Sequence, residues 1–443
     1  MQRPTWHPSW CGASEVKLRD VLHWPMKAIF WPPSLVLRQF GSAAYFSYLV
    51  GWRRFPSWVL RHGINSLPIA AGATGMGCIG YPGHPAWEVT SACNLRCIHC
   101  HVTADTPGPD ELNTDEAKGF IDDLARIDGF RMLVYTGGEP LVRKDIFALM
   151  HHSKEAGLIN VIATNGTLIT EETAFRLKEE GLACAAVSLD SWRDEVHDFV
   201  RNRQNTYGLA MRGIRALKKA GIPLQINCTA MQYNFDDLDE LLDLVDGLGS
   251  GIMLMYQLVP VGRGDDIRDA TLSVNENERL LKFLAKKQKD VSTIVEPVAG
   301  PQYWPYLMER KGLKNGTWLR VAEQVFHGCA AGRGFVYIKA NGDVWPCPFV
   351  EVIAGNVKER PFDRIWEDSP VFAALRNREN TLKGRCGDCR YRAMCGGCRG
   401  RAMACTGDYL AEDPSCFLED SLIDRAGPVR SSGRAPRSGR VSG

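Results

Sequence analysis

Short apolar runs alternate with amphipathic stretches between residues 87 and 257. The runs that favour strands are Trp87–Thr90, Met132–Thr136, Val161–Thr164, Ala185–Leu189, Gln225–Thr229 and Ile252–Gln257. The stretches that favour helices are Asp115–Ile127, Asp145–Ala156, Glu171–Glu180, Tyr207–Ala220 and Phe235–Leu248. Repeated strand and helix units predict an α/β fold with a parallel sheet and right-handed crossovers. Such a sheet places its site at the C-terminal ends of the strands.

A second pattern appears further along the chain, where Gly334–Lys339 and Asp343–Trp345 flank Asn341-Gly342. Asn-Gly between two β-rich runs is a strong signal for a hairpin turn. The hairpin is expected to fold Cys347 back towards Cys329.

Residues 1–85 have a different character from the rest, because they hold six of the twelve tryptophans and eight Lys/Arg against two acidic residues. Their longest uncharged run, Gln39–Trp52, is too short to span a bilayer. Three interpretations remain open: a helical arm packed on the barrel, a peripheral contact with a membrane surface, or a site for a partner or substrate leader. A glycine-rich linker is expected at 72–80, and residues 421–443 are expected to form a disordered tail.

The composition is that of a soluble globular protein, with 45% hydrophobic and 23% charged residues and a formal net charge of +2. That charge gives no reason to expect nucleic acid as a partner. Fifteen cysteines in a chain without a recognisable cleavable signal peptide favour a reducing compartment, where clustered thiols usually serve metals or catalysis. We therefore expect a cytoplasmic protein, with a peripheral position on the membrane as the variant that residues 1–85 suggest.

The densest cysteine motif is Cys93-x3-Cys97-x2-Cys100, directly after the first predicted strand. Three thiolates ligate three irons of a [4Fe–4S] cluster and leave the fourth iron open, because no further cysteine follows until Cys184. An iron without a protein ligand is free to bind a substrate or cofactor. The alternatives are a zinc knuckle or three inert buried thiols.

This motif resembles the radical SAM superfamily, and so does Tyr135-Thr-Gly137-Gly138-Glu139-Pro140 after the second predicted strand. The resemblance implies a partial (β/α)6 TIM-like barrel, here at 86–310. It also implies that S-adenosyl-L-methionine (SAM) chelates the open iron and yields a 5′-deoxyadenosyl radical, which abstracts a hydrogen atom from the substrate.

The same resemblance assigns cofactor contacts to further strand ends. Gly137, Gly138 and Glu139 are expected to hold the SAM amino group, and Thr164 and Asn165 to lie near its ribose. Further along the chain, Ser188 and Asp190 form a polar strand end over the cofactor, and Arg201 is expected to hold the SAM carboxylate. The alternatives are turn chemistry before Gly166 and a helix N-cap at Ser188 or Asp190. Arg203 competes with Arg201 because Asn202 replaces the glycine that the family usually has there.

Residues 311–420 resemble the SPASM extension of radical SAM enzymes, which houses two auxiliary Fe–S clusters. The first cluster is assigned Cys329, Cys347 and Cys398, and the second Cys386, Cys389, Cys395 and Cys416. No cysteine follows Cys329 by a few residues, so the first cluster has an open iron, a non-cysteine ligand, or Cys405. A zinc ribbon built from the two C-x2-C pairs is the alternative.

The resemblance as a whole implies a radical SAM enzyme with one catalytic and two auxiliary clusters. Its substrate is expected to be either a tetrapyrrole of haem synthesis, oxidised at a propionate side chain, or a peptide that is cross-linked or oxidised. Arg263, in Pro260-Val-Gly-Arg-Gly264, is expected to be a flexible anchor for a substrate carboxylate. A low-potential donor such as ferredoxin or flavodoxin is the expected electron source. The alternative of a different class is a non-enzymatic Fe–S electron-transfer protein.

Overall fold

The computed structural model describes residues 44–62, 84–127, 132–313, 315–326 and 328–419. The linker at 72–80, Cys11, Cys78 and the tail at 421–443 lie outside the described residues.

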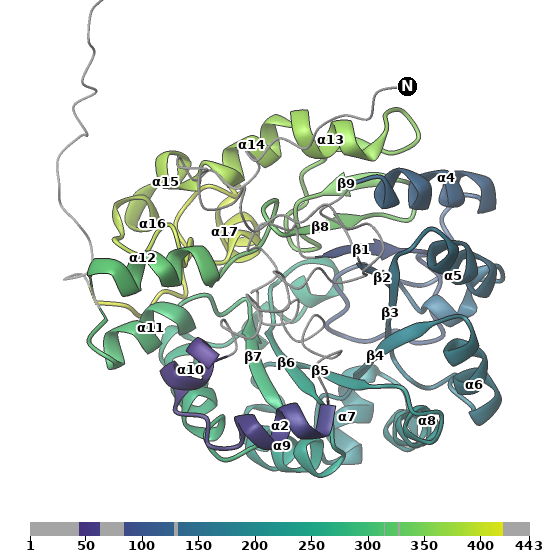
Figure 1. Ribbon diagram of the computed structural model, residues 1–443, viewed down its shortest axis with the longest axis horizontal. Coiled ribbons are helices and arrows are strands. Elements are labelled where there is room, and N and C mark those ends of the chain that lie inside the picture. The colour runs from purple at the N-terminus through teal and green to yellow at the C-terminus, as the bar shows by residue number, and fades with distance from the viewer. Residues whose placement is uncertain (1–43, 63–83, 128–131, 314, 327, 420–443) are drawn as a thin grey trace, which may run out of the picture.

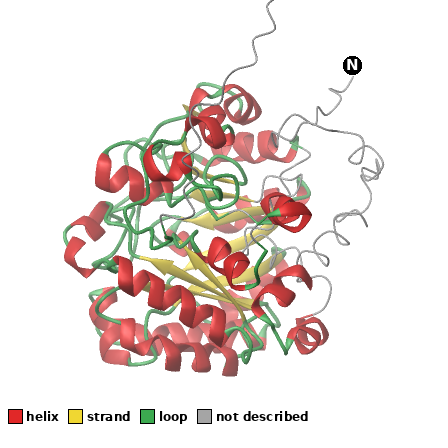
Figure 2. Ribbon diagram, turned by 90° about the vertical axis from the view of Figure 1, so that its left-hand side faces the viewer, coloured by secondary structure: helices red, strands yellow, loops and turns green. Residues whose placement is uncertain are grey.

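The strands of the described chain join one sheet, in the order β10-β9-β8-β1-β2-β3-β4-β5-β6-β7. Their bounds are β1 His84–Glu88, β2 Met132–Thr136, β3 Ile159–Thr164, β4 Leu182–Ser188, β5 Leu224–Ala230, β6 Ile252–Gln257, β7 Ile294–Val298, β8 Phe335–Ile338, β9 Asp343–Trp345 and β10 Gly355–Asn356. Strands β1 to β7 are parallel, each paired with the next along the chain. The predicted α/β fold with a parallel sheet is confirmed (Figures 1 and 2).

Helices follow most of these strands. Their bounds are α2 Phe55–His62, α4 Thr114–Ala125, α5 Ile146–Glu155, α6 Glu171–Glu179, α7 Asp194–Arg201, α8 Thr206–Lys219, α9 Leu238–Gly247, α10 Val274–Lys287, α11 Tyr303–Arg310, α12 Gly316–Val325, α13 Phe362–Asp368, α14 Pro370–Arg376, α15 Arg378–Thr381, α16 Gly384–Asp388 and α17 Arg399–Thr406. Figure 1 shows α12 to α17 on the side of the molecule opposite α5, α6 and α8.

The start and the buried face of helix α4 follow from its local sequence. The Asn113 side chain accepts hydrogen bonds from the backbone N–H groups of residues 115 and 116, and the Glu116 carboxylate accepts one from the Asn113 N–H, which completes a capping box. Four residues at helical spacing, from Ala117 to Leu124, are buried on one face. Phe120 on that face contacts Trp87 edge to face, so α4 packs against the strand that leads into the cysteine motif.

Two barrel elements near residue 290 were not expected from the sequence. Strand β7 contains Pro297, which weakens a strand prediction, yet β7 ends the sheet and an edge strand tolerates proline. Helix α10 begins at a capping box of Ser273 and Glu276, a signal that the sequence does carry. The first strand also differs, because β1 begins at His84 and ends at Glu88, two residues before Thr90.

The described part of the N-terminal arm packs on the barrel. The indole Nε1 of Trp58 donates to the carbonyl of Gly251, and that of Trp52 donates to the carbonyl of Val291. Those carbonyls precede β6 and β7, so the arm covers the N-terminal ends of these strands, away from the C-terminal ends where a site is expected. Trp52 and Trp58 are both buried, at 4% and 1% exposure respectively. These contacts of residues 44–62 support the interpretation of a helical arm packed on the barrel.

The C-terminal module continues the barrel sheet. The expected hairpin forms from β8 and β9, which are antiparallel, and β8 also pairs in parallel with β1. The division expected at 310/311 falls between α11 and α12, but the sheet crosses it through β8.

Candidate functional site

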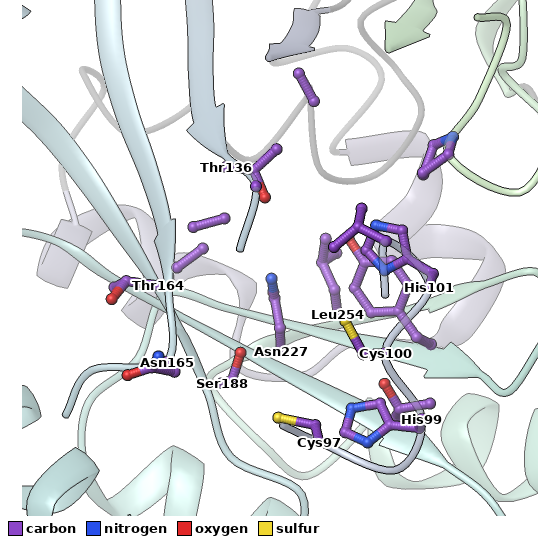
Figure 3. A pocket seen from close by; sticks show the side chains of 18 of the residues that line it. Cys97, His99, Cys100, His101, Thr136, Thr164, Asn165, Ser188, Asn227 and Leu254 are labelled. Carbon is purple, nitrogen blue, oxygen red and sulfur yellow. The ribbon is translucent and has the colours of Figure 1, made fainter. Parts of the chain in front are cut away.

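The Cys93–Cys100 loop leaves β1 at the C-terminal edge of the sheet. Its three cysteines line a cavity of about 260 Å³, and Figure 3 shows Cys97 and Cys100 on one wall with Thr164 and Asn165 facing them. Burial raises the pKa of Cys93 to about 11 and also raises that of Cys97. Without metal these thiols stay protonated at neutral pH, so cluster binding must release protons. Three thiols on one loop, facing one cavity, fit a cluster with one open iron.

Gly137 and Gly138 let the second motif lie directly against the start of the cysteine loop. The backbone N–H of Gly138 donates to the carbonyl of Thr90, and that of Glu139 to the carbonyl of Ala92, both at 2.8 Å. A Cβ atom on Gly138 would lie 2.0 Å from the Ala92 oxygen, and Gly137 has φ +133°. Only glycine fits this close approach.

The Glu139 carboxylate joins two strand ends behind the cavity wall. It accepts hydrogen bonds from Thr164 Oγ1 and from the Asn165 N–H, both at 2.8 Å. Burial raises the pKa of Glu139 to about 7. The side chain is fully buried, whereas Thr164 and Asn165 lie on the wall itself.

Arg201 reaches the cavity from the end of α7. Its Nη2 lies 2.7 Å from Asp190 Oδ2, and its Nη1 donates to Cys97 Sγ at 3.7 Å. Although burial opposes ionisation, the Arg201 guanidinium holds the pKa of Asp190 below its usual range. Asp190 therefore lies behind Arg201 and positions it, while Arg201 lines the cavity together with Ser188. Arg203 is exposed, with its Nη1 on the Asn94 carbonyl.

Arg263 lines the cavity, as an anchor for a substrate carboxylate requires, but its side chain is held in place and is not flexible as its flanking glycines suggested. Its Nε donates to the carbonyl of Cys97 at 2.9 Å and its Nη1 to that of Ala104 at 3.0 Å. A Cβ atom on Gly262 would lie 2.6 Å from the Cys100 carbonyl oxygen. The loop therefore braces the cysteine motif, because these backbone acceptors hold the guanidinium in place. We expect Arg263→Ala to weaken SAM cleavage as well as substrate turnover.

Several cavity residues were missed in the sequence. Asn227 on β5 and Tyr256 on β6 line the cavity, and so do His101, Tyr337 and Phe349. The alternation of inward and outward positions along β5 and β6 is the signal that would have found the first two. No sequence signal places Phe349 there, because it comes from the C-terminal module. The imidazole of His101 contacts the rings of Tyr337 and Phe349 edge to face.

Seven of the C-terminal cysteines lie in two groups. The pKa of Cys347 is raised, chiefly by burial and further by the nearby thiols of Cys329 and Cys398. These three cysteines therefore form the first group. The other four, Cys386, Cys389, Cys395 and Cys416, line one small cavity of about 20 Å³. Cys405 is exposed.

No group of three or more His, Cys, Asp or Glu side chains in the described ranges is arranged to hold a single metal ion. The thiolates of a cubane bind different irons, so they need not converge on one point. Thiols grouped in three and in four fit the donor set of Fe–S clusters.

Two segments of the chain match known families. Residues 87–245 match the Radical SAM superfamily, and residues 329–390 match the iron–sulfur cluster-binding domain SPASM. The chain is 40% identical over 337 residues to the AdoMet-dependent heme synthase of Methanosarcina barkeri, across 75% of this chain and 95% of that protein. This chain belongs to the radical SAM superfamily. As a radical SAM protein it is an enzyme whose cofactors are [4Fe–4S] clusters and SAM, so a non-enzymatic electron carrier is no longer an alternative.

This radical SAM enzyme is also 32% identical to the mycofactocin maturase MftC of Mycolicibacterium smegmatis, across 68% of this chain and 74% of that protein. Among solved structures, it resembles Streptococcus suis SuiB bound to precursor peptide SuiA, with a TM-score of 0.61 and 18% identity over 76% of each chain. That structural similarity shows the fold alone. Among the residues that the structure describes, no helix has the length and apolar character needed to cross a bilayer.

Proposed function

We propose that this radical SAM enzyme oxidises a propionate side chain of a tetrapyrrole during haem synthesis. The observation that carries the proposal is the 40% identity to an AdoMet-dependent heme synthase, of which the match covers 95%.

In this proposal each described wall of the cavity has a task. Cys93, Cys97 and Cys100 hold the catalytic cluster, which with SAM supplies a 5′-deoxyadenosyl radical. Arg201, held by Asp190, stays charged beside Cys97 and is placed to hold the SAM carboxylate.

The second motif and the strand ends position SAM in the same proposal. The backbone of Gly137 and Gly138 receives the SAM amino group, and the buried Glu139 carboxylate supports that wall by fixing Thr164 and Asn165. Thr164, Asn165 and Ser188 line the wall where the nucleoside is expected.

The proposed reaction converts a propionate side chain of the substrate into a vinyl group. A propionate side chain loses one hydrogen atom to the radical, then carbon dioxide and one electron, and becomes a vinyl group. Removal of that electron needs a one-electron acceptor, a role that suits the proposed auxiliary clusters at Cys329, Cys347 and Cys398 and at Cys386, Cys389, Cys395 and Cys416. Tyr256, Tyr337 and Asn227 line the cavity and are placed to orient the side chain.

Further parts of the proposal lie outside the cavity. The division into an arm at 1–85, a barrel at 86–310, a cluster module at 311–420 and a tail at 421–443 belongs to it. A ferredoxin or flavodoxin is the proposed electron donor. A peripheral membrane contact would involve the part of residues 1–85 outside the packed segment 44–62.

The test uses anaerobically reconstituted full-length protein with SAM, dithionite and an iron tetrapyrrole that carries four propionate side chains. We expect 5′-deoxyadenosine together with loss of carbon dioxide and two hydrogens per converted side chain, measured by mass spectrometry. The matched control is the protein with Cys93, Cys97 and Cys100 replaced by Ala. Release of 5′-deoxyadenosine with an unchanged tetrapyrrole contradicts the proposed substrate.

A peptide substrate is the second candidate, because of the 32% identity to a mycofactocin maturase. The same assay separates the two. If a precursor peptide is modified and the tetrapyrrole is not, the enzyme is a peptide maturase.

A further inference from the structure

Arg378, at the start of α15, is a buried arginine whose hydrogen-bond partners are all backbone carbonyls. Its side chain donates to the carbonyl of Cys329 at 2.8 Å, to that of Met394 at 3.0 Å and to that of Ala393. The residue is 2% exposed. No carboxylate of the described residues forms an ion pair with it. Burial, followed by the guanidinium of Arg333, lowers the pKa of Arg378 to about 9.

Among the other buried arginines of the described residues, Arg399 donates to backbone carbonyls and to Cys386 Sγ, whereas two others have a carboxylate counter-ion. Arg201 pairs with Asp190 at 2.7 Å, and Arg401 pairs with Asp413 at 3.0 Å. A buried charge without a partner is costly, because neither water nor an opposite charge stabilises it. The folded chain tolerates Arg378 most easily if a negative group that the polypeptide does not supply lies beside it.

The position of Arg378 indicates what that group is. The guanidinium interacts electrostatically with the thiols of both Cys329 and Cys395, which belong to different proposed auxiliary ligand sets. The chain makes room for it at Gly396, where a Cβ atom would lie 2.7 Å from Arg378 Nη1. Arg378 therefore lies between the two groups of cysteines, and its hydrogen bonds fix the backbone beside each of them.

We propose that the Arg378 guanidinium is a counter-ion shared by the two auxiliary clusters and that it raises the reduction potential of both. The inference rests on the auxiliary ligand sets given under the proposed function. A cluster held by cysteine thiolates is anionic and gains one more negative charge on reduction. A fixed cation in a low-dielectric interior stabilises that reduced form more than the oxidised form.

The test compares Arg378→Gln, which removes the charge, with Arg378→Lys, which keeps it. Both variants are measured as reconstituted full-length protein by redox titration followed by electron paramagnetic resonance. For Arg378→Gln we expect the reduction equilibrium of each auxiliary cluster to shift at least tenfold towards the oxidised form, which is about 59 mV for one electron. Arg378→Lys should stay near the parent, and the catalytic cluster serves as the internal control in both variants.

Iron content and potential together separate the outcomes. Lower auxiliary potentials in Arg378→Gln alone support the inference, and so does loss of auxiliary iron in Arg378→Gln alone. Unchanged potentials with full iron overturn it, and so does equal loss of iron in both variants, because the hydrogen bonds and not the charge would then matter. If the parent protein itself binds only about four irons, the proposed ligand sets fail first.

Discussion

The cysteines of the barrel site and those of the C-terminal module differ in how much open space surrounds them. The Cys93–Cys100 loop opens on a cavity of about 260 Å³, whereas the four cysteines of the proposed second auxiliary set surround about 20 Å³. The barrel therefore has open space beside its three thiols, where SAM is proposed to bind. The module has no comparable space around those four thiols, and its proposed task is limited to electrons. The space around the thiols therefore distinguishes the proposed site of SAM chemistry from the proposed site of electron transfer.

Removal of the barrel thiols should have the largest effect. Replacing Cys93, Cys97 and Cys100 together by Ala should remove about four of about twelve irons and abolish SAM cleavage, because the module keeps its own ligands. Iron analysis and chromatography of 5′-deoxyadenosine measure both. Cys184→Ala, at a buried cysteine outside the three groups, should retain all the iron. A triple variant that still cleaves SAM would refute the assignment of the loop.

The ion pair beneath the barrel site offers a second test. Asp190→Ala leaves the buried Arg201 without a carboxylate counter-ion, which should lower the free energy of unfolding of the cluster-free protein by about 3–5 kcal/mol. Urea unfolding measures the change. The control is Asp265→Ala, which breaks an exposed pair with Arg268 and should cost less than about 1 kcal/mol. Equal losses in the two variants would show that burial of the pair is unimportant.

Glu139 should make the stability of the cluster-free protein depend on pH. Its folded pKa of about 7 lies above the unfolded value, so its stabilising contribution is complete at low pH and is lost as the pH rises through 7. Between pH 5 and pH 8 the parent should lose about 2–3 kcal/mol more than Glu139→Gln. Denaturant unfolding at the two pH values measures the difference. Parallel pH profiles would mean that Glu139 is ionised in the folded chain.

Cys405 should have the smallest effect. Because it is exposed, Cys405→Ser should leave the iron content and the auxiliary electron paramagnetic resonance signals unchanged, whereas Cys398→Ser should alter them. Loss of one cluster in Cys405→Ser would instead identify this residue as the fourth ligand of the first auxiliary cluster.

Patterns of local sequence were enough to predict most of the barrel. All five predicted helices are present with ends within three residues, because their buried faces and caps are written in consecutive residues. Strand β7 was missed because Pro297 conceals an edge strand. The pairing of β8 with β1 was missed because contacts between residues about 250 positions apart leave no periodic signal.

The candidate site divides in the same way. The cysteine groups and the Gly-Gly-Glu motif could be named because they resemble the motifs of a known family, and the structure places Gly138 and Glu139 against the start of the Cys93–Cys100 loop. The fixed position of Arg263 could not be predicted from the sequence, because its partners are backbone carbonyls, which every residue has. The position of Asp190 behind Arg201 depends on burial, and no short motif records burial.

The pairing of β8 with β1 limits how far this enzyme can be divided. The strand that carries the catalytic loop has β2 on one side and a strand of the cluster module on the other. A chain shortened at Arg310 would turn β1 into an open edge, with unpaired backbone groups available to another copy. It would also lose Tyr337 and Phe349 from the cavity wall. The barrel and the cluster module therefore cannot be exchanged separately between proteins. The smallest unit that keeps the site intact includes both.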